Sequence, residues 1–355
     1  MKSYCKLDGD KKYMNVKIYE NRQRTTKEKA RIILMAVILL SVISVFLGVI
    51  MGSSDISMKS FLEAYLKKET SSSVYRIMVY TRLPRVLGAF LAGSALAVCG
   101  NILQSVLQNP LASPSVIGVN NGAGILVLLC SALLPGIPSL LPLAAFLGAL
   151  FTALAVFFLA MGQGVSRVTL VLTGIAISSI LGAGMNCIMI LYPDAYIGAS
   201  TFLVGGLSGV TMENLAAPVW YIGIGLLMAM IQRKDMNIVS LGNDTARSLG
   251  MNVGRTRFFL ILTAAILAGA TVSFAGLVSF VGLIIPHAFR FLVGNDNRHL
   301  VPISIFAGGS FMILCDLISR TAFSPYEVPV GILLSFLGGP FFIYLIIRSR
   351  RKIND

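Results

Sequence analysis

The sequence predicts an all-α, polytopic membrane protein, and two observations lead to that fold class. Of its 355 residues, 56% are hydrophobic and only 12% are charged, with a mean hydropathy of +0.82, whereas soluble domains are about 45–50% apolar and about 25% charged. The stretch from Val86 to Ser166 contains no Asp, Glu, Lys or Arg. Because a helix needs about 20 apolar residues to cross a bilayer, that stretch alone has room for several crossings. This composition excludes an ordinary cytosolic enzyme, a disordered protein and a disulfide scaffold.

Helix breakers and charges divide the chain into about ten apolar spans. Asn109-Pro110 and Ser113-Pro114 separate the second span from the third, and Gly162-Gln163-Gly164 ends the fourth. The seventh and eighth spans meet near Ala275-Gly276, where the break is shortest. The expected spans are 32–52, 83–107, 115–134, 140–161, 168–191, 214–232, 257–275, 279–293, 300–319 and 328–347.

The placement of the basic residues predicts the topology. A net charge of +14 is usual for a nucleic-acid-binding protein, but here the Lys and Arg residues cluster at the chain ends and in one loop. Loops on the cytoplasmic side of a membrane are enriched in Lys and Arg, so this distribution places both termini in the cytoplasm and predicts a lipid bilayer, not a nucleic acid, as the partner. We expect a cytoplasmic extension over 1–31, a transmembrane domain over 32–347 and a cytoplasmic tail over 348–355.

Small residues recur every four positions in three of the spans, and this spacing lets helix backbones approach closely in lipid. We favour packing within the chain over a dimer seam as its explanation, since the motif is common in helix bundles. The residues are Ala89, Gly93 and Ala97, then Gly118 and Gly122, then Ala265, Gly269 and Ser273.

Residue patterns typical of an enzyme are missing from the sequence. It has no G-x-x-x-x-G-K-[ST] loop, so it does not hydrolyse ATP by that route. Its two histidines, His287 and His299, are too few for a zinc site, which needs about three protein ligands. The five cysteines form no C-x-x-C pair. We therefore predict no catalytic residue, no metal site and no cofactor.

The positions of ionisable residues near the ends of the spans indicate their environment. Asp316 and Arg320 lie four residues apart and can pair along one helix face. Arg82 and Arg85 flank Pro84 close to the expected interface, where we expect them to reach toward headgroups and not to be buried. In the segment from Asp235 to Arg255, glycine-containing turns and spaced apolar residues predict a short amphipathic helix at the inner surface.

Several short motifs are similar to those of one family. They are Arg82-Leu-Pro-Arg85, Gly93-Ser-Ala-Leu-Ala97, Asn109-Pro-Leu-Ala-Ser-Pro114, Gly118-Val-Asn-Asn-Gly-Ala123, Ala246-Arg-Ser-Leu-Gly250, the run from Phe280 to Arg290 containing Pro286-His287, Asp316 with Arg320, Pro329-Val-Gly331 and Gly339-Pro-Phe341. The chain resembles the FecCD-type permeases, which are membrane subunits of ABC importers for iron-siderophores, haem and cobalamin. The resemblance runs from about Arg82 to the C-terminus and leaves the first 30 residues and the segment 53–75 uncovered.

The resemblance implies a fold, a set of partners and a cargo. The fold is that of an ABC importer type II permease with ten helices, in a bacterial cytoplasmic membrane. The partners are a second permease subunit (the same chain or a paralogue), two ATPase subunits that hydrolyse ATP, and an extracytoplasmic substrate-binding protein. The cargo is a metal chelate, with an iron-siderophore favoured and haem or cobalamin as alternatives. An ion-coupled secondary transporter is the alternative from a different class.

The resemblance also implies three groups of functional residues. Arg82, Arg85 and Arg320 would dock the binding protein, with anchoring at the interface as the alternative. The segment 239–253 would couple to the ATPase through Leu241, Ala246, Leu249 and Gly250, with a helix resting on headgroups as the alternative. Asn109, Leu111, Val165 and Ser166 would form the inner gate, although Asn before Pro110 also favours a simple turn.

Overall fold

The computed structural model describes residues 27–52, 63, 72–161, 166–324 and 326–354, and the regular structure in these residues is entirely helical. Seven of the described helices are long and apolar enough to cross a bilayer, and the three shorter apolar helices are Val119–Leu133, Val281–Val293 and Val330–Tyr344. Together they correspond one to one with the ten expected spans. The prediction of an all-α, polytopic membrane fold is therefore confirmed.

The helices follow one another in a simple order along the chain. They are Lys27–Ile50 (the first helix), α3 (Ser73–Arg76), the π-helix η1 (Ile77–Arg82), α4 (Leu83–Leu107), the 3-10 turn η2 (Pro114–Ile117), α5 (Val119–Leu133), the 3-10 turn η3 (Pro138–Leu140), α6 (Leu141–Met161), α7 (Arg167–Leu191), α8 (Pro193–Val204), α9 (Met212–Ile231), α10 (Arg233–Ser240), α11 (Asn243–Ser248), α12 (Val253–Ala275), α13 (Val281–Val293), α14 (Asn297–Thr321) and α15 (Val330–Asn354).

Three features of this order differ from the expected spans. The second span begins ten residues early, at Ser73, because α3, η1 and α4 form one continuous helix. The single amphipathic helix expected in the inner segment is instead two short helices, α10 and α11. They are divided at Gly242, whose φ of 110° is a conformation that residues with a side chain rarely adopt. The third feature, α8, is a short helix that the span pattern did not predict.

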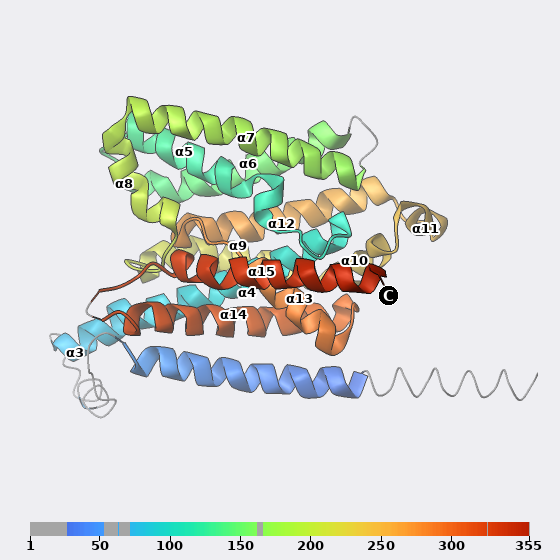
Figure 1. Ribbon diagram of the computed structural model, residues 1–355. Helices are drawn as coiled ribbons and strands as arrows, with labels where there is room; N and C mark the ends of the chain where they lie inside the picture. The colour runs from blue at the N-terminus through green and yellow to red at the C-terminus, as the bar shows by residue number, and fades with distance from the viewer. Residues whose placement is uncertain (1–26, 53–62, 64–71, 162–165, 325, 355) are drawn as a thin grey trace, which may run out of the picture.

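Helix α4 lies in the middle of the bundle and contacts α14, α12, α13, α9 and α10. Most of its residues are buried, polar ones such as Asn101 and Gln104 included. Helix α12 connects α4 to α6, and α5, α6, α7 and α8 pack together on one side (Figure 1). The first helix packs on the opposite side, where the Ser41 hydroxyl lies 2.7 Å from that of Ser310 on α14.

Small residues hold α4 against its neighbours, at Gly93 as the four-residue spacing predicts and at Gly100 outside that spacing. A side chain at Gly93 would collide with the backbone of Gly308 on α14, and one at Gly100 would collide with Gly282 on α13. A side chain at Gly122 on α5 would likewise meet α6. These close approaches are all within the chain, which confirms the intramolecular interpretation of the motif.

The bundle has two distinct ends (Figure 1). At one end, which we call the α11 end, lie α10, α11, the start of the first helix and the C-terminal end of α15. At the other, the α3 end, lie α3, the end of the first helix and the start of the α14–α15 connection. The described chain thus begins and ends on the same side of the bundle, as the expected topology requires.

Candidate functional site

The three arginines assigned to docking lie together at the α3 end. With two carboxylates they form a group, Arg82, Arg85, Asp316, Arg320 and Glu327, which we call the arginine cluster. The Arg85 Nε donates to both carboxylate oxygens of Asp316, at 3.0 and 3.1 Å, and its Nη1 donates to Glu327 at 2.8 Å. The Arg320 Nε lies 3.4 Å from the Asp316 Oδ2, so the expected pair along α14 is confirmed.

The first helix ends on this cluster. The Arg82 Nη1 donates to the carbonyl oxygen of Val49 at 3.1 Å and also to that of Ile50, and the Arg320 Nη2 donates to that of Gly48. The last carbonyls of a helix lack partners within it and carry partial negative charge. Two guanidinium groups therefore cap the first helix, a contact that no local sequence pattern indicates.

The burial of these arginines corrects one expectation. Arg82 is 3% exposed, Arg85 7% and Arg320 3%, so the expectation that Arg82 and Arg85 reach to headgroups unburied is wrong. The reason is that partners within the chain compensate their charges, which makes burial tolerable. Only the pair of Arg85 and Glu327 approaches the surface, since the Glu327 side chain is 34% exposed.

The residues assigned to ATPase coupling lie at the α11 end, but not all on the surface. Leu241 and Leu249 are each 61% exposed, and Gly250 is exposed at a φ of 81°. Ala246 is fully buried. Two apolar side chains and a glycine turn therefore project from α10–α11, while Ala246 supports the turn from within.

The gate residues lie beside this projection. Asn109 and Ser166 line one cavity of about 590 Å³, and Asn243 of α11 lines it as well. Leu111 is half-buried, and its amide donates to the Asn109 Oδ1 at 2.9 Å, so Asn109 also forms the turn that Pro110 favours. Val165 lies outside the described residues. The fold thus brings two residues assigned to the gate, and one from the segment assigned to coupling, to one cavity, although they are far apart in the sequence.

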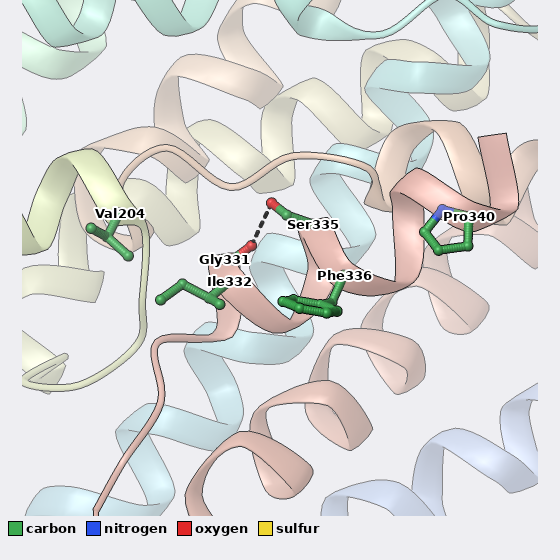
Figure 2. A pocket seen from close by; sticks show the side chains of 6 residues that line it. All are labelled: Val204, Gly331, Ile332, Ser335, Phe336 and Pro340. Atoms are coloured by element: carbon green, nitrogen blue, oxygen red, sulfur yellow. Dashed lines mark hydrogen bonds between the residues drawn. The ribbon is translucent and has the colours of Figure 1, made fainter. Parts of the chain in front are cut away.

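A second cavity, of about 620 Å³, lies along α15 (Figure 2). The Ser335 Oγ donates to the Gly331 carbonyl at 2.8 Å, so its hydroxyl is satisfied within the helix and the cavity wall is mainly apolar. Phe336 is 76% exposed. The lining residues are Val204, Gly331, Ile332, Ser335, Phe336 and Pro340.

Non-helical backbone meets beside this cavity. The Gly331 amide donates to the Gly205 carbonyl at 3.1 Å, and the Leu277 amide donates to the Phe202 carbonyl at 3.0 Å. Gly205 and Gly276 adopt φ values of 76° and 67°, which glycine permits without strain. Irregular backbone within a membrane is tolerated where protein or a water-filled path satisfies it, and here hydrogen bonds between segments satisfy it.

A polar network at the α11 end has no signature in the sequence. The Asn237 Nδ2 on α10 donates to the Asp296 Oδ1 at 2.7 Å, and the Asn297 amide donates to the Asn237 Oδ1 at 2.8 Å. The Gln108 Nε2 at the end of α4 donates to the Val239 carbonyl at 2.7 Å. Asn237 and Asp296 are 59 positions apart, so no periodicity in the sequence connects them.

Asp296 is held in its charged form by this network. Partial burial works against ionisation, but hydrogen bonds from the Arg298 amide and the Asn237 side chain outweigh it, and the pKa of Asp296 lies below its usual range. Asp296 also caps α14 by accepting from the Arg298 amide at 2.9 Å.

A half-buried cation, Arg290, likewise connects α13 to α4. The Arg290 Nη2 donates to the Asn101 Oδ1 at 2.7 Å and its Nε to the Gln104 Oε1 at 3.3 Å. Gln104 in turn donates to the Gly282 carbonyl at 3.2 Å. The resemblance motif contains Arg290, but only the fold shows that amides on α4 receive it.

Comparison with known proteins shows which proteins have a similar sequence and architecture. The chain is 36% identical to the Fe(3+)-citrate import system permease protein YfmE of Bacillus subtilis, over 93% of this chain and 99% of that protein. It is 33% identical to the hemin transport system permease protein HmuU of Yersinia pestis, over 91% and 97% of the two chains. Among solved structures, a metal-chelate type ABC transporter in an inward-facing conformation superposes with a TM-score of 0.79 at 25% identity, covering 89% of this chain and 99% of that one.

A family model gives the same result along nearly the whole transmembrane region. The model of the FecCD transport family matches residues 27–348, which includes the first helix as well as the region from Arg82 onward. The match covers the arginine cluster, the cavity at the α11 end and the cavity on α15. This chain belongs to the FecCD transport family.

Proposed function

We propose that this chain is one of two permease subunits of an ATP-driven importer that carries a ferric chelate, an iron-siderophore in the first instance. The observation that carries the proposal is the cavity at the α11 end, where gate residues Asn109 and Ser166 lie beside Asn243 of the coupling segment. A transporter driven from the cytoplasm needs its gate next to the point where force enters. The similarity to iron-citrate and hemin permeases supports a metal chelate as cargo.

Two ATPase subunits bind at the α11 end in this proposal. Leu241 and Leu249 project into solvent at more than half of their full exposure, and exposed leucines in a short polar segment suit a protein partner better than water. Ala246 stabilises the segment and makes no direct contact. Replacing Leu249 with Glu should prevent co-purification of the ATPase, whereas Leu134→Glu, at an exposed position in the connection after α5, should not.

A second permease subunit covers the face formed by α7 and α15. Few residues of α7 are buried within the chain, and Phe336 and Ile332 of α15 are exposed beside the apolar cavity. When the α7–α15 faces of two subunits lie opposite each other, the space between them forms the path for the chelate. The lining is mainly apolar, which suits a bulky ligand that has to pass without being held.

The binding protein docks at the α3 end, where Arg85 is the member of the arginine cluster with a partner at the surface. In this structure the Arg85 Nη1 donates to the Glu327 carboxylate. A carboxylate of the binding protein would take the same place, because arginine holds carboxylates through paired hydrogen bonds. Arg82 and Arg320 orient the site from beneath by holding the end of the first helix.

Uptake measurements test the cargo and the energy source together. The chain, its ATPase, its second permease and its binding protein are expressed in a strain that lacks its own importers. We expect uptake of radiolabelled ferric siderophore that stops when ATP hydrolysis is blocked by vanadate and continues when a protonophore dissipates the ion gradient. Uptake of haem or cobalamin alone would assign the cargo to those alternatives. Uptake that the protonophore abolishes and vanadate spares would replace the proposal with an ion-coupled transporter.

A further inference from the structure

We propose that α10 is the mechanical link between the ATPase and the gate, with Asn237 and Gln108 as the two side chains that transmit the movement. This inference rests on the proposed function and adds to it a pair of positioning residues that connect the coupling segment to the path-forming helices. Both side chains are amides that reach across the α11 end to another helix.

The first contact connects α10 to the end of α4. Gln108 ends α4 in a left-handed conformation, with a φ of 47°, and donates to the Val239 carbonyl on α10 at 2.7 Å. A non-glycine residue in that conformation is uncommon and carries strain, which the bond to α10 helps offset. The next residue along the chain is Asn109, at the gate cavity. A displacement of α10 therefore acts directly on the start of the gate turn.

The second contact connects α10 to the start of α14. Both polar atoms of the Asn237 carboxamide are bonded: its Nδ2 donates to Asp296, and its Oδ1 accepts from the amide and the side chain of Asn297, each at 2.8 Å. Asn297 is 1% exposed. A buried amide that loses such partners leaves polar groups unpaired, at a cost above that of an ordinary hydrogen bond. The contact therefore resists separation of α10 from α14.

Packing makes α10 a rigid body. Met236 is fully buried and Val239 is 1% exposed, so the helix is seated on α4 and α14 by its apolar face while its amides bond at the edges. Helix α10 is joined to α11 through Leu241 and Gly242, and α11 leads directly into Leu249, the residue proposed to meet the ATPase. Force applied at Leu249 consequently reaches α4 and α14 through α11, the turn at Gly242 and the packed helix α10.

An exchange of two side chains tests the link at Asn237. Asn237→Asp sets two carboxylates against each other and removes one part-buried hydrogen bond. We expect chelate uptake per ATP hydrolysed, measured in vesicles that contain the full complex, to fall about tenfold. The double variant Asn237→Asp with Asp296→Asn restores the donor and the acceptor and keeps a capping side chain on α14. It should recover most of the uptake per ATP.

Two further variants separate transmission from folding. Gln108→Asn keeps an amide but shortens it by one carbon, so that it falls short of Val239, and it should also lower uptake per ATP. Ser200→Ala is the control, because the Ser200 hydroxyl makes the same kind of bond within a helix, donating to the Ile197 carbonyl on α8, far from α10 (Figure 1), and it should leave the ratio unchanged. The ratio is measured per assembled complex, so a lower yield of protein does not affect it.

The outcomes are distinct. If Asn237→Asp and Gln108→Asn show the wild-type ratio, or if the double variant fails to recover, the link is refuted. Loss of assembly without a change in the ratio would make α10 a purely structural element and would refute it as well. If vesicles of the wild-type complex show no ATP-driven uptake of any ferric chelate, the proposed function fails, whatever the variants do.

Discussion

Asp316 balances the charges of the arginine cluster. Its carboxylate lies between the guanidinium groups of Arg85 and Arg320 and is 1% exposed. The three arginines exceed the two carboxylates by one charge, and the carbonyl end of the first helix supplies the remaining negative potential. Charge and hydrogen bonding are therefore satisfied as a group, and the removal of one member affects all the others.

The first prediction concerns the removal of the Asp316 charge. Asp316→Asn should lower the free energy of unfolding by about 3–5 kcal/mol, because it removes the counter-ion of buried Arg320 and leaves buried Arg85 with Glu327 alone. Asp194→Asn is the control: Asp194 is exposed in the first turn of α8, where a carboxylate contributes at most about 1 kcal/mol. Thermal unfolding of the purified chain in detergent compares the two. Equal shifts in melting temperature would show that the cluster does not depend on Asp316.

The second prediction concerns Glu327 and the proposed docking site. Glu327→Gln should strengthen binding of the substrate-binding protein, because it frees the outer face of Arg85, and Arg85→Gln should weaken it. A part-exposed ion pair contributes about 1 kcal/mol, so we expect changes of roughly fivefold in opposite directions at low salt.

Binding measured at low and high ionic strength checks this prediction. Salt screens exposed charges over about 8–10 Å, so the difference between the variants should shrink as salt is added. Glu213→Gln, at an exposed position in the first turn of α9, is the matched control. If both Glu327→Gln and Arg85→Gln weaken binding, Glu327 supports docking and does not compete with it.

At the scale of elements, direct backbone-to-backbone contact at glycines holds α4 in the centre of the bundle. Gly93 and Gly100 bring its backbone against α14 and α13 on two different faces. In lipid there is little hydrophobic force between helices, so packing and close backbone approach provide the attraction. The four-residue spacing in the sequence indicated the face that carries Gly93, but it did not include Gly100 and did not indicate which helix each face meets.

The third prediction compares two glycines inside helices. Gly100→Ala should destabilise the chain by about 1–3 kcal/mol, because the added methyl group collides with the Gly282 backbone, which has no room to yield. Gly223→Ala on α9 adds the same methyl group into open space and should stabilise the helix by about 0.5–1 kcal/mol. Melting temperatures of the two variants should therefore move apart, and a stable Gly100→Ala variant would contradict the close approach.

At the scale of the whole molecule, the apolar face of α15 and the exposed face of α7 require a partner or lipid. The fourth prediction distinguishes them. Phe336→Cys, in a background in which the exposed Cys187 is replaced by Ser, should be crosslinked between permease subunits by a bifunctional thiol reagent that spans the path. Leu227→Cys, on an equally exposed part of α9, should give no crosslink, because that face is expected to meet lipid.

The gel mobility and the mass of the crosslinked product show which subunits have been joined. A product of twice the subunit mass indicates two copies of this chain, and a product containing a second polypeptide indicates a paralogue. Crosslinking that is equal at both positions would show random collision in the membrane, and would remove the α15 face as the dimer interface.

The sequence by itself determined the all-α fold, the ten spans, the packing faces and the lack of a nucleotide-binding loop. These properties are local, because bilayer thickness sets the length of an apolar run and a helix repeats every 3.6 residues. The tertiary structure alone decided that Arg82 and Arg85 are buried, that Ala246 points inward and that Asn237 joins α10 to α14. Those outcomes depend on partners such as Asp316, which lies 231 positions from Arg85, and no local pattern carries information over that distance.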